Sequence, residues 1–287
     1  MRVLVIGGTG MLGHKLVQVL GPDFDVWTTI RRRFEEVERF GIFDGNTTTA
    51  DIDVEDHAKL REAILRAEPD VVINAVGIIK QLETPKQINE VLPHKLAEFS
   101  AEFGFRLICI STDCVFSGET GNYNEADKPD ATDIYGMSKA RGEVTENNCL
   151  TIRTSIIGRE LDTSHSLVEW FLSNRGGTVG GFTNVIYTGF PTIVLAEILL
   201  RVISDQPKLS GLFHVSSDPI SKYDLLKLID DNYRAGVNIV PTAELHNDRS
   251  LDSSKFRALT GFTPEPWAEM VRRMAADPTA YDDFRHR

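Results

Sequence analysis

The chain has 287 residues, of which 41% are hydrophobic, and it carries a formal net charge of −11. This length and composition fit a soluble globular protein with one large domain, or with a domain and a smaller lobe. The acidic charge and the lack of a long basic run argue against nucleic-acid binding.

Cysteine content and hydropathy bear on metal binding, on the cellular compartment and on membrane association. Cys109, Cys114 and Cys149 form an odd number without the spacing of metal ligands, and the seven histidines are scattered. We therefore expect no metal site and predict reduced thiols in a cytoplasmic protein. The apolar run 3–6 is too short for a signal peptide, and no stretch is long enough to span a bilayer, so no membrane association is expected.

The first twenty residues predict a strand, a glycine-rich turn and a helix. The aliphatic run 2–6 is typical of a strand buried on both faces of a parallel sheet. Gly7, Gly10 and Gly13 follow at once, and apolar residues then recur at helical spacing up to Gly21. Glycines in this context let the backbone approach a pyrophosphate, and the helix start offers free N–H groups. We predict that the turn binds a dinucleotide through the following residues: Gly7, Thr9, Gly10, Met11, Leu12 and Gly13.

A second strand is expected at 25–30, and its end should meet the adenosine ribose. A carboxylate at this place would bind the 2′-hydroxyl of NAD, but the chain has Arg31, Arg32 and Arg33 there. Guanidinium groups pair with phosphate, so Arg31 and Arg32 favour the 2′-phosphate of NADPH over NADH, which remains possible. A solvated run of charges is the alternative interpretation.

Strand and helix patterns continue to alternate up to residue 154. We predict strands at 50–54, 70–74, 105–111 and 150–154, and helices at 55–67, 89–103 and 135–147. Cofactor contacts are expected from Asp53 and Val54 at the third strand end, and from Asn74, Ala75 and Val76 at the fourth. Small residues at these ends would let the sheet lie close under a flat ligand.

Tyr135 and Lys139 lie four residues apart, so on a helix they share a face. An ammonium beside a phenol would lower the pKa of the phenol and let Tyr135 transfer a proton near neutral pH. Thr112 ends a predicted central strand, where open α/β sheets place their ligands, and its hydroxyl could reach the same oxygen. We predict carbonyl or alcohol chemistry with Thr112, Tyr135 and Lys139 as catalytic residues.

The second half of the chain is less periodic. We predict helices at 166–174, 191–204, 222–232 and 267–276, with short strands around 178, 185–187 and 211–215. Arg249 lies in this half and could contact a diphosphate.

In these motifs the chain resembles the extended short-chain dehydrogenases/reductases. It shares their motifs in order and spacing: Gly7-x-x-Gly10-x-x-Gly13, Asn74-Ala75-Val76-Gly77, Ser111-Thr112 and Tyr135-x-x-x-Lys139. Within this group it is similar to dTDP-4-dehydrorhamnose reductases over Ser111-Thr112-Asp113-Cys114-Val115-Phe116-Ser117-Gly118, Tyr123, Glu125, Pro129 and Tyr135-Gly136-x-Ser138-Lys139. Those reductases commonly have an aromatic residue in place of Cys114, so the resemblance does not decide which sugar the substrate carries.

The resemblance implies a Rossmann-like doubly wound parallel sheet with a smaller C-terminal substrate lobe. It assigns 1–155 to dinucleotide binding and 156–287 mainly to the lobe, with segments near 185–215 returning to the sheet. The implied reaction is NADPH-dependent reduction of a 4-keto group on a nucleotide-diphosphate-sugar. Tyr135 would protonate the oxygen and Lys139 would also hold the cofactor ribose. The implied substrate contacts are Thr112, Asp113, Tyr135 and Arg249, in a monomer or a homodimer.

Two other functions remain open. The first is a nucleotide-sugar epimerase or dehydratase with tightly held NAD. A dehydratase of this kind would carry an Asp-Glu pair after the threonine, whereas here Asp113 is followed by Cys114. The second is a non-catalytic regulatory subunit that binds a dinucleotide. Such proteins often lose the tyrosine or the lysine, and this chain has both.

Overall fold

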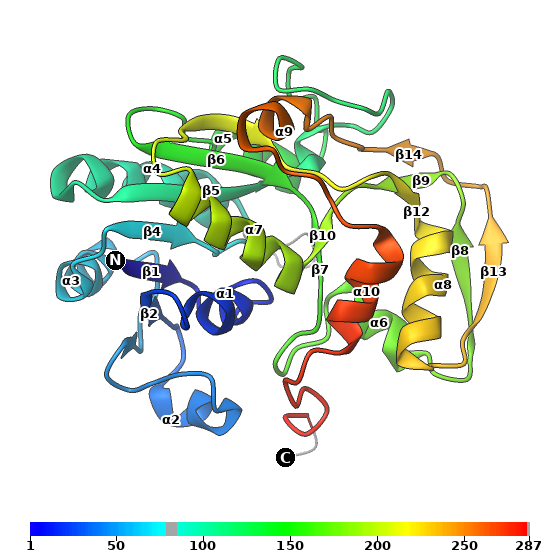
Figure 1. The fold of residues 1–287 in the computed structure, drawn as a ribbon, viewed down its shortest axis with the longest axis horizontal. Helices are drawn as coiled ribbons and strands as arrows, with labels where there is room; N and C mark the ends of the chain where they lie inside the picture. Colours follow the sequence, from blue (N-terminus) through cyan, green and yellow to red (C-terminus); the bar gives the residue numbers. More distant parts are fainter. Residues whose placement is uncertain (79–84, 286–287) are drawn as a thin grey trace.

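The computed structural model describes residues 1–78 and 85–285, and it is built around one parallel sheet of seven strands (Figure 1). Across the sheet the strand order is β3-β2-β1-β4-β5-β6-β11. The order reverses between β1 and β4, as in a doubly wound sheet. This confirms the predicted fold class. The strands are β1 (Arg2–Ile6), β2 (Asp25–Thr29), β3 (Thr48–Thr49), β4 (Val71–Asn74), β5 (Arg106–Thr112), β6 (Cys149–Thr154) and β11 (Gly211–His214).

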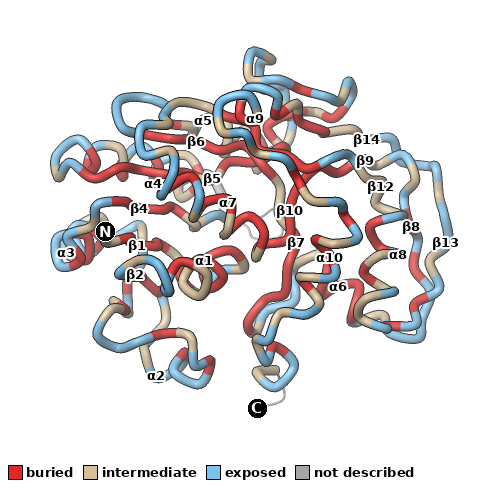
Figure 2. Tube along the Cα trace, viewed as in Figure 1, coloured by how far each residue is buried: buried red, intermediate tan, exposed pale blue. Residues whose placement is uncertain are grey.

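Helices cover both faces of the sheet. The helices of this part are α1 (Gly13–Leu20), α2 (Phe34–Val37), α3 (His57–Ala67), α4 (Pro85–Phe103), α5 (Ile134–Arg141) and α7 (Thr192–Asp205), with 3-10 turns η1 (Glu38–Phe40) and η2 (Asp113–Val115). Side chains alternate along β1: Val3 and Val5 join the core shared with α1 and α7, while Leu4 and Ile6 join the core under α3 and α4. The strands are therefore buried along most of their length (Figure 2).

The rest of the second half forms a smaller lobe beside the sheet, at the right of Figure 1. Its strands are β7 (Ile156–Ile157), β8 (Thr178–Phe182), β9 (Val185–Tyr187), β10 (Phe190–Pro191), β12 (Ile220–Ser221), β13 (Asn238–Thr242) and β14 (Asn247–Asp248), and its helices are α6 (Leu167–Ser173), α8 (Lys222–Tyr233), α9 (Ser254–Thr260) and α10 (Trp267–Ala275). Because β11 pairs with β6, and α7 packs on α1, the second half contributes to both parts of the molecule.

Three predicted elements differ from the structure. The helix predicted at 89–103 already begins at Pro85, and the other two differ for identifiable reasons. No strand forms at 50–54, and β3 ends at Thr49, because Asp51 has a φ of 58° that a strand cannot continue through. The helix after Tyr135 ends at Arg141 instead of near 147. At the next residue, a Cβ on Gly142 would lie 2.0 Å from the Asn89 carbonyl oxygen. The end of α5 therefore packs directly against the backbone of α4 at this glycine.

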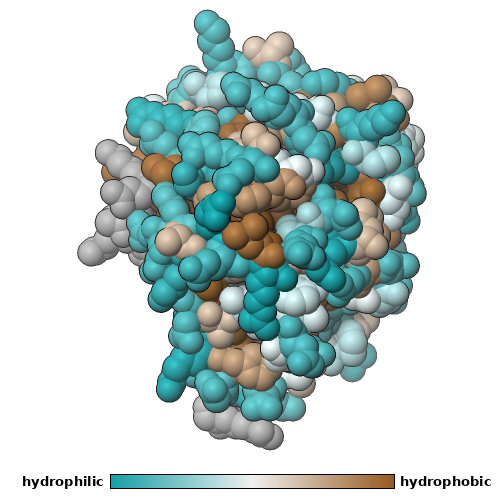
Figure 3. Space-filling view, turned by 90° about the vertical axis from the view of Figure 1, so that its left-hand side faces the viewer, coloured by the Kyte–Doolittle hydropathy of each residue, from teal (hydrophilic) through white to brown (hydrophobic). Residues whose placement is uncertain are grey.

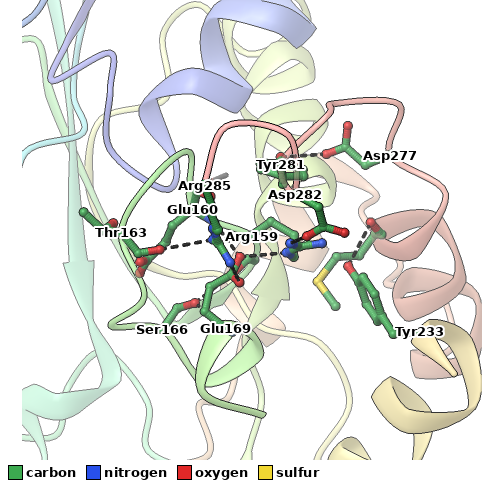
Figure 4. A network of polar contacts seen from close by, with 12 residues as sticks. Arg159, Glu160, Thr163, Ser166, Glu169, Tyr233, Asp277, Tyr281, Asp282 and Arg285 are labelled. Carbon is green, nitrogen blue, oxygen red and sulfur yellow. Dashed lines mark hydrogen bonds and ion pairs between the residues drawn. The ribbon is translucent and has the colours of Figure 1, made fainter. Parts of the chain in front are cut away.

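The C-terminal residues beyond α10 return to the first half of the chain through buried polar contacts. The Lys15 ammonium on α1 lies 2.5 Å from the Asp277 carboxylate, and the His14 ring nitrogen Nε2 lies 2.9 Å from the Tyr281 hydroxyl. The Arg285 guanidinium also pairs with the fully buried Glu169 carboxylate of α6 (Figure 4). This segment therefore links α1 to the smaller lobe.

Among residues 1–78 and 85–285, no helix combines the length and apolar content that crossing a membrane requires. The face in Figure 3 is mostly hydrophilic, with apolar residues visible in limited areas.

Candidate active site

The glycine-rich turn after β1 is packed so tightly that side chains cannot replace its glycines. Gly7 has a φ of 88°, a left-handed conformation that favours glycine. A Cβ on Gly13 would lie 2.0 Å from the Gly7 carbonyl oxygen, and one on Gly8 would lie 2.2 Å from the Thr28 hydroxyl oxygen. The turn therefore lies directly against β2 and the first residue of α1.

A cleft of about 240 Å³ opens at the carboxyl ends of β1, β2 and β4. Its lining includes eight of the predicted cofactor residues: Gly7, Thr9, Gly10, Arg31, Asp53, Val54, Ala75 and Val76. The other predicted cofactor residues are not among the lining residues: Met11, Leu12, Gly13, Arg32, Asn74, Tyr135 and Lys139. The position at the strand-order reversal and the glycine cradle fit a dinucleotide.

Gly13 and Asn74 do not line the cleft, but they hold the backbone that lines it. Gly13 permits the close approach to Gly7 described above. The Asn74 side-chain oxygen accepts a hydrogen bond from the Val76 backbone N–H at 3.1 Å, which fixes the turn after β4. Their part is to position the backbone.

The three arginines after β2 point in different directions. Arg31 lines the cleft, whereas Arg32 forms two hydrogen bonds to the Asp162 carboxylate, at 2.5 and 2.9 Å. Arg33 pairs with Glu36 at 2.8 Å on the surface. Only Arg31 of the three therefore faces the proposed adenosine end of the cleft.

Thr112, Tyr135 and Lys139 come together at the carboxyl end of β5. Asp133 accepts a hydrogen bond from the Gly136 backbone N–H at 2.8 Å and so begins α5 just before Tyr135. Lys139 lies one turn later, and its ammonium donates to the Ile110 carbonyl of β5 at 2.8 Å. A Cβ on Gly77 would lie 3.7 Å from this ammonium, which places Lys139 beside the cleft.

The prediction that the Lys139 ammonium lowers the pKa of Tyr135 is wrong. Burial raises the pKa of the phenol above its ordinary value, the nearby Cys114 thiol raises it further, and hydrogen bonding with the Thr112 hydroxyl opposes the shift. The Lys139 ammonium points at the Ile110 carbonyl, and burial lowers the pKa of Lys139 itself. Tyr135 is therefore a protonated phenol at neutral pH.

Two charged side chains of the smaller lobe, Arg249 and Lys222, approach Asp113 and Cys114. The Arg249 Nη1 lies 3.4 Å from the Cys114 sulfur. Burial raises the pKa of the Asp113 carboxyl, while the charges of Lys222 and Arg249 oppose that rise. The Lys222 ammonium also lies 4.1 Å from the centre of the Tyr187 ring. These contacts place two cations of the lobe close to Asp113 and Cys114, which follow Thr112 in the chain.

Sequence reasoning missed several residues of this region. Asn89 holds the loop after β4, since its Nδ2 donates to the Ile78 carbonyl at 2.9 Å and its Oδ1 accepts from the Ile78 N–H at 3.0 Å. Asn89 Nδ2 also lies 3.3 Å from the Ser138 hydroxyl of α5. Tyr187 and Lys222 were missed because they come from separate elements of the lobe, the end of β9 and the start of α8. For Lys222, the only local sign is its place after the capping Ser221, whose hydroxyl accepts from the Asp224 N–H at 3.0 Å.

No group of three or more histidine, cysteine, aspartate or glutamate side chains that could hold a metal ion occurs within the described ranges 1–78 and 85–285.

The doubly wound sheet, its glycine-rich first turn and the helix that carries Tyr135 and Lys139 define an extended short-chain dehydrogenase/reductase. The family described as the RmlD substrate binding domain matches residues 1–279, and the chain belongs to this family.

Curated relatives of two kinds are similar to the chain. The methionine adenosyltransferase 2 subunit beta of Bos taurus is 28% identical over 247 residues, which cover 81% of this chain and 72% of the relative. The dTDP-4-dehydrorhamnose reductase of Aggregatibacter actinomycetemcomitans is 24% identical and covers 96% of this chain and 98% of its own.

The structure of dTDP-4-dehydrorhamnose reductase from Bacillus anthracis in complex with NADP superposes with a TM-score of 0.79. It is 21% identical to this chain, and the superposition covers 96% of this chain and 99% of that one. At this level of identity the superposition supports the fold.

Proposed function

We propose that the protein is an NADPH-dependent reductase of a 4-keto group on a nucleotide-activated deoxysugar. The observation that carries this proposal is the meeting of Thr112, Tyr135 and Lys139 beside the glycine-lined cleft. Membership of the RmlD family and the reductase from Aggregatibacter actinomycetemcomitans support the same function.

The cleft residues fit NADPH, and the Bacillus anthracis structure is a complex with NADP, which carries the same 2′-phosphate. The turn from Gly7 to Gly13 would hold the pyrophosphate, and Arg31 would meet the 2′-phosphate. Lys139, next to Gly77, would hold the nicotinamide ribose. When bound, NADPH supplies the hydride for the reaction. NADH would bind the same cleft without using the charge of Arg31.

In this proposal Tyr135 donates its phenolic proton to the carbonyl oxygen as the carbonyl carbon is reduced. The raised pKa keeps the phenol protonated until that oxygen gains negative charge. The Thr112 hydroxyl donates to Asp113 Oδ1 at 3.1 Å in the structure, and in this proposal it turns to donate to the same carbonyl oxygen and stabilises its charge. Tyr135 then regains a proton from solvent, which completes the cycle with one alcohol formed.

The smaller lobe would bind the nucleotide-diphosphate part of the substrate. Arg249 and Lys222 place two cations near Asp113, and a diphosphate is an anion that such a pair attracts. Asp113 would contact the sugar beside Thr112.

The test is a panel of nucleotide 4-ketosugars, each made in place by a dehydratase and followed by NADPH absorbance. One NADPH oxidised for each ketosugar reduced is the expected result. Tightly held NAD, with product formed and no net oxidation, would instead support an epimerase or dehydratase.

A second candidate function is a regulatory subunit without turnover. The similarity to methionine adenosyltransferase 2 subunit beta, a protein named as a subunit, favours this candidate. Dinucleotide binding without turnover on any ketosugar, together with a stable complex with another protein purified from cells, would support it.

A further inference from the structure

Arg32 stands in the arginine run at the cofactor end of the sheet, yet its guanidinium is already paired. Arg32 Nη1 lies 2.5 Å from Asp162 Oδ2, and Nη2 lies 2.9 Å from Oδ1, so both ends of the fork are used. Arg39 joins the same carboxylate, with Nη2 2.9 Å from Oδ2. The Asp162 side chain is only 17% exposed, so these contacts are partly shielded from water.

Asp162 is charged under ordinary conditions. Hydrogen bonding from Arg32 lowers the pKa of the Asp162 carboxyl, and the charges of Arg32 and Arg39 add to that lowering. The ion pair with Arg32 is therefore complete at neutral pH.

The loop that carries Asp162 is held from its other side. Arg285 Nη2 donates to the Glu160 carbonyl at 2.9 Å and to the Thr163 carbonyl at 3.1 Å, so it bonds the loop on both sides of Asp162 (Figure 4). The Glu160 backbone N–H donates to the buried Glu169 carboxylate at 3.0 Å. Asp162 therefore has a fixed position, and Arg32 meets it there.

Within residues 1–78 and 85–285, Arg31 forms no ion pair like that of Arg32 with Asp162, and it is instead part of the cleft wall with Asp53 and Val54. After β2 the chain turns at Arg31 and Arg32 instead of continuing as a strand, and the two side chains reach different places, Arg31 the cleft and Arg32 the Asp162 carboxylate.

We propose that Asp162 sets the cofactor preference of the protein by withholding Arg32 from the cleft, so that Arg31 alone recognises the 2′-phosphate. This inference rests on the proposed dinucleotide binding and does not depend on turnover of a sugar. It assigns a specificity role to a residue 130 positions away from the arginine run in the sequence.

The experiment measures the dissociation constants of NADPH and NADH by fluorescence titration of the full chain. Arg31→Ala should lower the preference for NADPH by about tenfold or more, because a charge-assisted contact is lost. Arg32→Ala should leave the preference for NADPH over NADH within about twofold of that of the unchanged protein. Asp162→Asn should tighten the binding of NADPH by about tenfold without changing the affinity for NADH. The double variant with Arg32→Ala should lose that gain in affinity.

Glu36→Gln is the matched control. It releases Arg33, which is 69% exposed, from a comparable pair at 2.8 Å and should leave the preference unchanged.

The proposal is overturned if Arg32→Ala lowers the NADPH preference as much as Arg31→Ala, because Arg32 would then leave Asp162 for the phosphate. An unchanged NADPH affinity in a folded Asp162→Asn protein also overturns it. Should Asp162→Asn fail to fold, the comparison of Arg31→Ala with Arg32→Ala decides alone. A chain that keeps its NADPH preference but reduces no ketosugar would count against the proposed function and leave this inference intact.

Discussion

Replacing Gly13 by alanine tests whether close packing of the glycine-rich turn maintains the cofactor cleft. The new Cβ would lie 2.0 Å from the Gly7 carbonyl oxygen and 3.0 Å from the Gly8 Cα. Ordinary contact begins near 3.4 Å, so α1 and the turn must separate by about 1.4 Å. Backbone atoms make both contacts, so no flexible side chain can move aside.

The separation should affect both stability and binding. Overpacking of this kind costs about 1–3 kcal/mol. At about 2–4 °C per kcal/mol for a chain of roughly this size, the melting temperature should fall by about 2–12 °C. A displacement of about 1 Å at a positioned group can cost about 100-fold, so NADPH should bind on the order of 100-fold more weakly.

Thermal melting and fluorescence titration with NADPH measure the two effects. Gly180→Ala in β8 is the matched control, because its Cβ would meet nothing closer than the Thr242 methyl group at 3.7 Å. That variant should bind NADPH like the unchanged chain. If Gly13→Ala keeps both its melting temperature and its NADPH affinity, the reasoning that this packing holds the cleft is refuted.

Three further predictions concern the reaction and the buried charges. Tyr135→Phe should lower ketosugar turnover by about 100-fold or more while NADPH still binds, and near-normal turnover would end the proposed mechanism. Because burial raises the pKa of Tyr135, kcat for reduction should stay level up to about pH 9, below the ordinary tyrosine value of about 10; a loss centred near pH 7 would contradict this. Glu169→Ala leaves Arg159 and Arg285 without their shared carboxylate and should cost about 3–5 kcal/mol in the free energy of unfolding measured with denaturant. The same change at the exposed Glu62 of α3 should cost less than about 0.5 kcal/mol. Equal losses in the free energy of unfolding would show that the buried Glu169 stabilises the protein no more than a surface glutamate does.

The sequence by itself determined the doubly wound fold, the first turn and the start of the helix that carries Tyr135 and Lys139. An aliphatic run, glycines at fixed spacing and a helical repeat are local patterns, and they predicted β1 and α1 to within a residue of their observed bounds. The spacing of Tyr135 and Lys139 placed both on one helix face for the same reason. Local patterns are informative here because the buried strands and their covering helices need no distant partner to set their periodicity.

Only the tertiary structure decided which charged groups meet. Arg32 and Arg31 are adjacent in the sequence and chemically identical, but the carboxylate that holds Arg32 comes from a loop beyond β7. The Tyr135 pKa likewise depends on burial and on Cys114, and Lys139 is turned to a carbonyl of β5. Burial and long-range ion pairs arise from the packing of segments far apart in the chain, so no short sequence pattern could predict them.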